Sequence, residues 1–359
     1  MIFVKSEDLK YGMRLAKPIY NKTGVLLYER NTRLTLQGIE SVKNFGLLGL
    51  YILEPAEPVP PMSEEDLDFE RFQTMAVFSI REELDNIIAG REPINLKRLA
   101  NAIITNYVRL DHKITFTQNL RSTTDYVYKH VINTAILCAL ISAQVYYTPT
   151  EQEELVLAAL LHDIGKLLLP NKVREKYDDY DTNDLIIVKK IQNDGLGLLR
   201  PEIGIDSGVR RIVAQIHRME YGNSNLEQGK ILKSTKILKV TMTCMKISEE
   251  AISEIAAIKY LLLNKDEFDE EIVGALIKSI NILTPGVCIE LTNREKGLVI
   301  SENPQNILRP VVLGFSTNKI YDLSNNGVYR RYQIVDIMKT MDNRIKVDRE
   351  RLEEYMNKR

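Results

Sequence analysis

The chain has 359 residues, of which 44% are hydrophobic and 27% are charged, a composition typical of a globular protein with two or three domains. Its 48 basic and 49 acidic residues leave a net charge of −1, which excludes a non-specific nucleic-acid binder that relies on a basic face. Three widely separated cysteines predict reduced thiols. The amino terminus lacks the apolar stretch of a signal peptide, and the most apolar long run, residues 131–145, is too short and too polar for a bilayer. We therefore expect a cytoplasmic protein with no membrane span.

Residues 1–54 predict a small α+β module. Its expected elements are, in order, strands at 3–5, 16–20 and 25–28, a helix at 35–44 and a strand at 50–53. Residues 21–24, Asn-Lys-Thr-Gly, are typical of a hairpin connection. Four prolines then fall within residues 55–62, which favours a stiff linker, and Ser63 can cap the next helix. Such a module on a linker suits contact with a protein partner.

Residues 63–284 show helical periodicity almost throughout, and their short connections predict one bundle. The expected helices cover a long segment containing Leu67 and Ile80, then 96–111, 126–145, a helix leading into His162, and 183–199, 207–219, 230–247 and 269–282. Residues 285–359 differ. Three short antiparallel strands are expected at 287–291, 297–301 and 310–315, followed by a charged amphipathic helix at 331–359, which could pack on its own domain or on a second subunit.

The segment from Leu155 to Pro170, LVLAALLHDIGKLLLP, carries the strongest chemical signal. Seven uncharged residues predict a buried helix, at whose end His162 and Asp163 follow each other. Burying an imidazole beside a carboxylate costs several kcal/mol unless something satisfies both groups, and a divalent cation does so. Lys166 adds a positive charge where a phosphate could bind. The alternative is a capped helix end whose polar groups bond only to the backbone.

The chain contains four histidines, three of which fall on predicted helices of the bundle. His130 opens an apolar helix and His217 ends another, so facing helices could bring both to one ion beside His162. A single histidine on such a helix is usually a core residue, but three together with Asp163 favour a metal site. His112, flanked by charges, is expected at the surface.

The chain resembles the HD-GYP family, a branch of the HD-domain metal-dependent phosphohydrolases that cleave cyclic di-GMP. The resemblance rests on GMRLAKPIYNKTGVLL, DYVYKHVINTA, LLHDIGKLLLP and FDEEIVGALIKSINILTPGVCIEL, which follow one another in the family's order. It implies a mainly α fold, an HD-type helical bundle with the α+β module before it and the β extension with its helix after it. HDIGK alone would fit other HD hydrolases too.

Carried over residue by residue, the resemblance implies a reduced site. His130, His162 and Asp163 match metal ligands, His217 is the one survivor of a double-histidine segment, and Lys166 matches the family's lysine. Asp163 and Lys166 are thus the implied catalytic residues.

At other positions of the family's pattern, this sequence lacks the residues that the family has there. Three ligand positions fall on the apolar residues Ile191, Ile216 and Met242, and the GYP tripeptide falls on 224–226, Ser-Asn-Leu. The family's chemistry commonly needs two metals about 3.5–4 Å apart. The remaining ligands could hold one iron, manganese or zinc ion.

We therefore expect a degenerate HD-GYP protein in cyclic di-GMP signalling, which binds this or a related nucleotide or regulates a partner, with weak or no phosphodiesterase activity. Lys166, Arg174 and Lys176 could hold phosphates; a solvated basic loop explains them equally well. Two alternatives remain open. One is an active phosphohydrolase that uses a reduced metal site around His130, His162 and Asp163. The other is a protein-interaction module without a small ligand.

Overall fold

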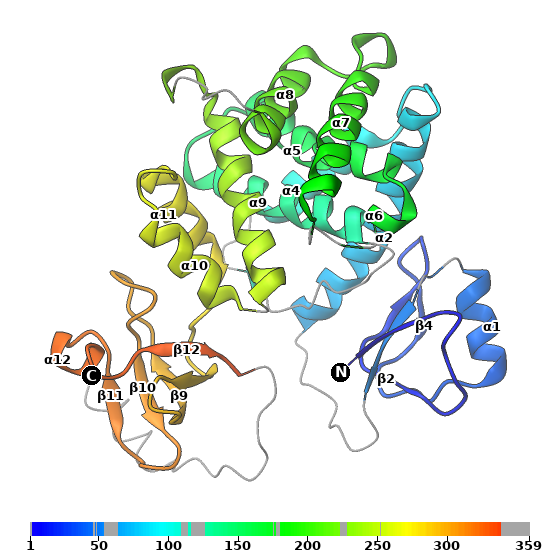
Figure 1. Cartoon of the computed structure of the whole chain (residues 1–359). Helices are drawn as coiled ribbons and strands as arrows, with labels where there is room; N and C mark the ends of the chain where they lie inside the picture. Colours follow the sequence, from blue (N-terminus) through cyan, green and yellow to red (C-terminus); the bar gives the residue numbers. More distant parts are fainter. Residues whose placement is uncertain are drawn as a thin grey trace. The chain divides into compact units, whose positions relative to one another are not determined.

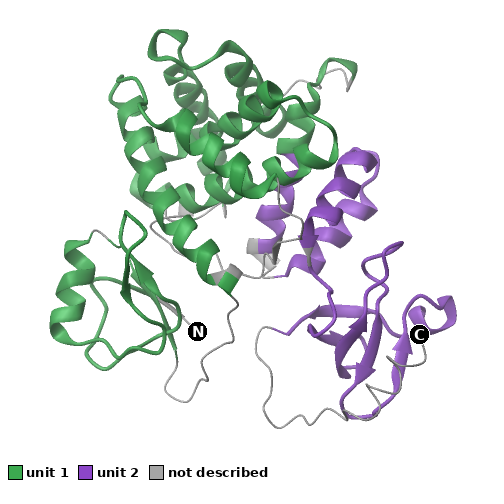
Figure 2. Ribbon diagram, turned by 180° about the vertical axis from the view of Figure 1, so that it is seen from behind, with its two compact units in different colours: residues 1–109, 120–238 green, residues 110–119, 239–359 purple. Residues whose placement is uncertain are grey.

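The computed structural model describes residues 2–45, 47, 49–53, 64–108, 114–115, 126–174, 176, 180–222, 228–251 and 253–338. The chain forms two compact units (Figure 2). The first contains residues 1–109 and 120–238, and the second contains residues 110–119 and 239–359. The predicted linker and Ser63 lie outside the described residues.

The α+β module at the start of the first unit is confirmed. Strands β1 (Ile2–Lys5), β5 (Gly49–Leu53) and β2 (Arg14–Leu15) form an antiparallel sheet in the order β1-β5-β2. Strands β3 (Ile19–Tyr20) and β4 (Leu26–Tyr28) form the expected hairpin, in whose turn Gly24 has a φ of 78°. Helix α1 (Leu36–Asn44) begins where the Thr35 hydroxyl accepts a hydrogen bond from the Gly38 amide.

The rest of the first unit is a helical bundle built around α5 (Figure 1). Its helices are α2 (Glu64–Ile88), α3 (Leu96–Tyr107), α4 (Tyr126–Gln144), α5 (Pro149–Leu161), α6 (Asn171–Arg174), α7 (Thr182–Leu198) and α8 (Ser207–Tyr221), with 3₁₀ helices η1 (Ile164–Leu168), η2 (Pro201–Ile203) and η3 (Gln228–Lys230). A capping box between Thr148 and Glu151 starts α5, and its residues 155–161 are all buried against α3, α4 and α8. This buried helix positions the residues that follow it.

Helix α9 (Lys233–Ala251) leads from the first unit into the second. The second unit continues with α10 (Glu254–Leu263), α11 (Glu270–Ser279) and a five-stranded antiparallel sheet in the order β11-β10-β9-β8-β12. The strands are β8 (Cys288–Leu291), β9 (Lys296–Ser301), β10 (Val311–Gly314), β11 (Ile320–Asp322) and β12 (Ile334–Ile337), with the short helix α12 (Asn326–Tyr329) before β12. A short parallel pair joins β6 (Ile114–Thr115) to β7 (Ile280–Asn281).

The carboxy-terminal part differs from the prediction most clearly at residues 334–337. The helix expected from residue 331 is wrong at its start, because residues 334–337 form β12 and pair with β8. The strand is held further by α10, since Lys259 Nζ donates to the Ile334 carbonyl and Ser253 Oγ donates to Asp336. Tertiary pairing thus overrode a helical pattern. Residues 339–359 lie outside the described residues.

The mainly α fold is confirmed. The helices expected at 183–199, 207–219, 230–247 and 269–282 correspond to α7, α8, α9 and α11, the last of which ends at Ser279. The elements that the sequence did not predict are α6, α10, α12, β2, β6, β7, β11 and β12. Within the described ranges, no helix has both the length and the apolar character needed to cross a bilayer. Cys138, Cys244 and Cys288 are buried and form no disulfide.

Candidate metal centre

The centre forms where α5 ends. Its last residue is Leu161, His162 follows as the cap, and Asp163 precedes the tighter 3₁₀ helix η1. The chain therefore turns directly after the apolar helix and places an imidazole and a carboxylate inside the bundle, where His162 is 0% and Asp163 is 1% exposed. Because burial of such groups is costly, they need polar partners close by.

Three side chains converge at this point. His130 of α4, His162 and Asp163 can each offer one ligand atom, and these atoms lie within 4.8 Å of one another. His162 Nε2 is 3.5 Å and His130 Nε2 is 3.8 Å from Asp163 Oδ2. Two histidines and one carboxylate suit iron, manganese or zinc with open positions on the ion.

The hydrogen bonding of His162 fits a metal ligand. Its Nδ1 lies 2.8 Å from the Ala159 carbonyl and must donate to that oxygen, so Nε2 carries the lone pair. Nε2 is buried and has no hydrogen-bond partner among the described residues. A metal ion at the cluster would satisfy this atom, so the residues present fit a single divalent ion.

Asp163 is also surrounded by protein donors. Lys166 Nζ lies 2.8 Å from Oδ2, and Gln192 Nε2 of α7 donates to Oδ1 over 2.9 Å. Burial by itself raises the pKa of the Asp163 carboxyl, but the charge and hydrogen bond of Lys166, together with His162 and His130, outweigh burial and hold the pKa far below its usual range. The carboxylate is therefore ionised and already neutralised by an internal cation.

His162 and His217 are neutral at physiological pH. Burial lowers the pKa of His162 to about 4, although the neighbouring Asp163 opposes this shift. Burial also lowers the pKa of His217, against the effect of its hydrogen bond to the His162 carbonyl. Neutral imidazoles are the form that binds metals.

His217 lies beside the cluster and outside its three-ligand group. Its Nε2 is 2.7 Å from the His162 carbonyl, to which it must donate. Its Nδ1 is buried and finds no hydrogen-bond partner in the part of the chain that the structure describes. In this arrangement His217 fixes the backbone of His162 and thereby supports the cluster.

The apolar residues at the three positions where the resemblance expects metal ligands lie in different environments. Ile191 is half-buried and packs against the cluster of Leu169, Val173 and Val188. Ile216 is fully buried on α8, next to His217. Met242 is half-buried on α9, among the residues of the second unit.

Gln192 is the functional residue that sequence reasoning missed. It reaches Asp163 because α7 approaches the η1 turn very closely. A Cβ on Gly195 would lie 2.6 Å from Gly165 Cα, and a Cβ on Gly165 would lie 2.7 Å from Gln192 Cα. The signal in the sequence was the pair of glycines, each needed where two backbones meet.

The predicted phosphate-binding cations are engaged by protein groups. Arg174 donates to the Leu167 carbonyl over 3.3 Å and to Asn171 Oδ1 over 2.6 Å. Lys176 pairs with Asp181 at 3.2 Å and with Asp184. Their phosphate role, like that of Lys166, stays a prediction. His112 and residues 224–226 lie outside the described residues.

The chain is similar to known proteins. The HD domain model matches residues 127–241, which include all three members of the cluster. Over 247 residues the chain is 21% identical to a cyclic di-GMP phosphodiesterase of Pseudomonas aeruginosa, with 67% of this chain and 58% of that protein aligned. The chain thus spans less than two thirds of that relative's length. Among solved structures, it is similar to an HDG"Y"P protein from Bdellovibrio bacteriovorus, with a TM-score of 0.44, 15% identity and coverage of 77% of this chain and 97% of the other.

The buried group of His130, His162 and Asp163 at the exit of a central helix could hold a metal ion. Residues 127–241 match the model of the HD domain family. The resemblance to cyclic di-GMP phosphodiesterases that the sequence indicated is confirmed by the Pseudomonas relative. HD domains are metal-dependent, and the His130, His162 and Asp163 group is the candidate centre.

Proposed function

We propose that this protein is a degenerate HD-GYP protein, which binds cyclic di-GMP or a related cyclic dinucleotide and hydrolyses it weakly or not at all. The observation that carries the proposal is the composition of the cluster. Its three metal-ligating residues can hold one ion, and both oxygens of its one carboxylate already contact Lys166 and Gln192. A site of this kind is poorly suited to two ions.

The number of ions decides the activity. Hydrolysis of a phosphodiester in a two-metal site needs both metals to stabilise the attacking and leaving oxygens. Here the second set of ligands is replaced by Ile191, Ile216 and Met242, whose side chains are apolar or offer only a soft thioether. Missing supporting groups alone cost roughly 10 to 100-fold in metal affinity, and missing ligands cost more.

The remaining polar groups still favour phosphate recognition. A bound divalent ion would supply Lewis acidity at a phosphodiester. The chain's own contribution is the lone pair of His162 Nε2, the ionised carboxylate of Asp163 and the ammonium of Lys166, all buried in one place. The name of the Pseudomonas relative supports cyclic di-GMP as the first ligand to test.

The second candidate function is an active phosphohydrolase with one ion. It is favoured by the buried Nε2 of His162, which has no hydrogen-bond partner and is oriented for a ligand by the Ala159 carbonyl. Calorimetry and product analysis with cyclic di-GMP, in excess manganese, separate the two functions. The proposal predicts binding of cyclic di-GMP with little or no linear product.

Two variants make this test specific. His162→Gln removes the ligand atom and keeps a polar side chain, and Lys172→Gln changes an exposed lysine nearby as a matched control. We expect cyclic di-GMP to bind to Lys172→Gln as it does to the unmodified chain and to bind more weakly to His162→Gln, because an ion held by His162 would contact a phosphate group. Rapid turnover by the unmodified chain that His162→Gln abolishes would establish the phosphohydrolase instead. Absence of any binding heat would contradict both.

A further inference from the structure

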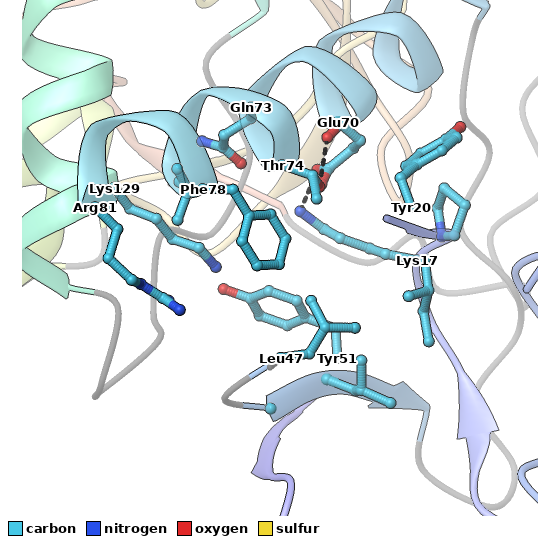
Figure 3. Close-up of a pocket in the computed structure, with 15 residues that line it drawn as sticks. Lys17, Tyr20, Leu47, Tyr51, Glu70, Gln73, Thr74, Phe78, Arg81 and Lys129 are labelled. Atoms are coloured by element: carbon cyan, nitrogen blue, oxygen red, sulfur yellow. Dashed lines mark hydrogen bonds and ion pairs between the residues drawn. The ribbon is translucent and has the colours of Figure 1, made fainter. Parts of the chain in front are cut away.

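A buried ion pair attaches the α+β module to α2. Lys17, which precedes β3, reaches Glu70 in the first half of α2, and Lys17 Nζ lies 2.5 Å from Glu70 Oε1 (Figure 3). The two side chains are 13% and 10% exposed. Because a carboxylate at this depth is costly without a cation, Glu70 holds Lys17, and with it the module, against α2.

The β3–β4 hairpin of the module contacts the same helix at a second point. Strand β3 packs against α2. The turn at Gly24 comes so close to the helix that a Cβ on Gly24 would lie 2.6 Å from Met75 Sδ and 3.3 Å from Arg71 Cγ. The module therefore lies on one short stretch of α2, residues 70–75.

The same stretch of α2 is also bonded to α4. Gln73 follows Glu70 by about one helical turn, so the two side chains are neighbours on the helix. Both line the pocket shown in Figure 3, together with Lys17. Gln73 Nε2 donates to Asn133 Oδ1 of α4 over 3.0 Å. Gln73 is 6% and Asn133 is 0% exposed, so this bond joins α2 to α4 inside the bundle.

Asn133 lies one turn from the metal centre. It follows His130 by three residues on α4, the helix that supplies His130 to the group of three ligands. Asn133 Nδ2 is buried and has no hydrogen-bond partner among the described residues. If Gln73 moved away, the Oδ1 atom of this buried amide would lose its bond too, which is costly. The turn of α4 that carries His130 should therefore follow Gln73.

We propose that the α+β module regulates the metal centre through Gln73, a positioning residue for His130. The Lys17–Glu70 pair fixes the turn of α2 that carries Gln73, and Gln73 fixes the adjacent turn of α4. Continuous chains of packed and hydrogen-bonded side chains can carry coupling between separate sites. A partner that lifts the module from α2 would release His130 and weaken the hold on an ion. This consequence for the ion rests on the proposed function, whereas the coupling from Lys17 to His130 does not.

Nuclear magnetic resonance of the full chain tests the coupling without any metal. The chain carries isotope-labelled histidine and is kept metal-free with a chelator; its four histidines give few imidazole signals, and His130→Gln identifies the signal of His130. Lys17→Met should move or broaden this signal. Lys17→Arg keeps the charge and should restore it. Lys22→Met is the matched control, because Lys22 is an exposed lysine in the turn of the same hairpin.

A double variant separates the coupling from a general loosening of the fold. Gln73→Leu removes the bond to Asn133, so adding Lys17→Met to Gln73→Leu should move the His130 signal no further. Additive effects would show that Lys17 acts by another route and would refute the role of Gln73. Melting curves show whether each variant folds. If Lys17→Met does not fold, Glu70→Gln breaks the same pair with a side chain of equal size. A His130 signal that neither variant changes would overturn the proposal.

Manganese titration by calorimetry tests the consequence for the ion. Lys17→Met should weaken manganese binding about fivefold or more, the lower end of the usual coupling between two sites, and Lys22→Met should not change it. Equal affinity of Lys17→Met and the unmodified chain would refute regulation of the centre by the module. If the unmodified chain binds no manganese, the metal site of the proposed function fails, and the His130 signal still decides the coupling.

Discussion

The ion pair between Lys166 and Asp163 should dominate the stability of the metal-free HD domain. Its atoms are 2.8 Å apart, and the two side chains are 6% and 1% exposed. At this distance two unit charges attract each other by about 6 kcal/mol for an effective dielectric constant of about 20. Removing one partner of such a buried pair typically costs about 3–5 kcal/mol, because the other charge is left without compensation.

Lys166→Met tests this magnitude directly. We expect the free energy of unfolding, measured by urea denaturation with a chelator present, to fall by about 3–5 kcal/mol. The Gln192 hydrogen bond to Asp163 Oδ1 remains and keeps the loss from being larger. The loss should be smaller in mildly acidic buffer, because Asp163 without its cation takes up a proton more readily.

Two further variants complete the test. Lys166→Met combined with Asp163→Asn removes both charges and should recover much of the lost stability, whereas Lys172→Met changes an exposed lysine and should stay within about 0.5 kcal/mol of the unmodified chain. Excess manganese should stabilise Lys166→Met more than the unmodified chain, because the ion replaces the missing cation. A loss below about 1 kcal/mol for Lys166→Met would show that the pair behaves like a surface pair and would refute the reasoning.

Three other predictions follow from the site. Gly165→Ala should destabilise the fold by about 1–3 kcal/mol or more in thermal or urea unfolding, because its Cβ would lie 2.7 Å from Gln192 Cα. The control Gly197→Ala, on α7, meets no atom within 4 Å and should be neutral or stabilising. In metal-free protein, the free energy of unfolding should fall by about 3 kcal/mol as the pH drops from about 6.5 to about 4. The reason is that the pKa of His162 is lowered in the folded state, so the unfolded chain takes up the proton first. The variant His162→Gln should flatten this part of the plot of unfolding free energy against pH. Gln192→His should raise the affinity for manganese, measured by calorimetry, because the side chain at position 192 reaches Asp163. Ile191→His should change this affinity less, because Ile191 packs against an apolar cluster. A larger gain in affinity for Ile191→His than for Gln192→His would show that the side chain of residue 191 reaches the ion.

Much of the fold follows from local sequence pattern. The apolar run at residues 155–161 and its Thr148 cap fixed α5, and the Asn-Lys-Thr-Gly turn fixed the first hairpin. Strand β12 could not be predicted in the same way, since its pairing with β8 depends on residues more than 40 positions away. Such contacts between distant residues leave little trace in the local periodicity.

The candidate site also contains some residues that the local sequence predicts and others that only the fold brings together. The adjacent His162 and Asp163 could be read from one pentapeptide, and His130 from its place on an apolar helix. The role of Gln192 could not, because it depends on the close approach of α7 to the turn at Gly165. A pocket lined by Lys17 of the α+β module, Arg81 of α2 and Lys129 of α4 (Figure 3) also escaped sequence analysis, since its lining comes from three separate parts of the chain.

The number of metal ions bound per chain tests the central claim most directly. Elemental analysis of protein equilibrated with excess manganese or iron, and then freed of unbound metal, gives this number. We expect at most one ion per chain, which His162→Gln removes. Two or more tightly bound ions per chain, together with brisk turnover of cyclic di-GMP, would contradict the account.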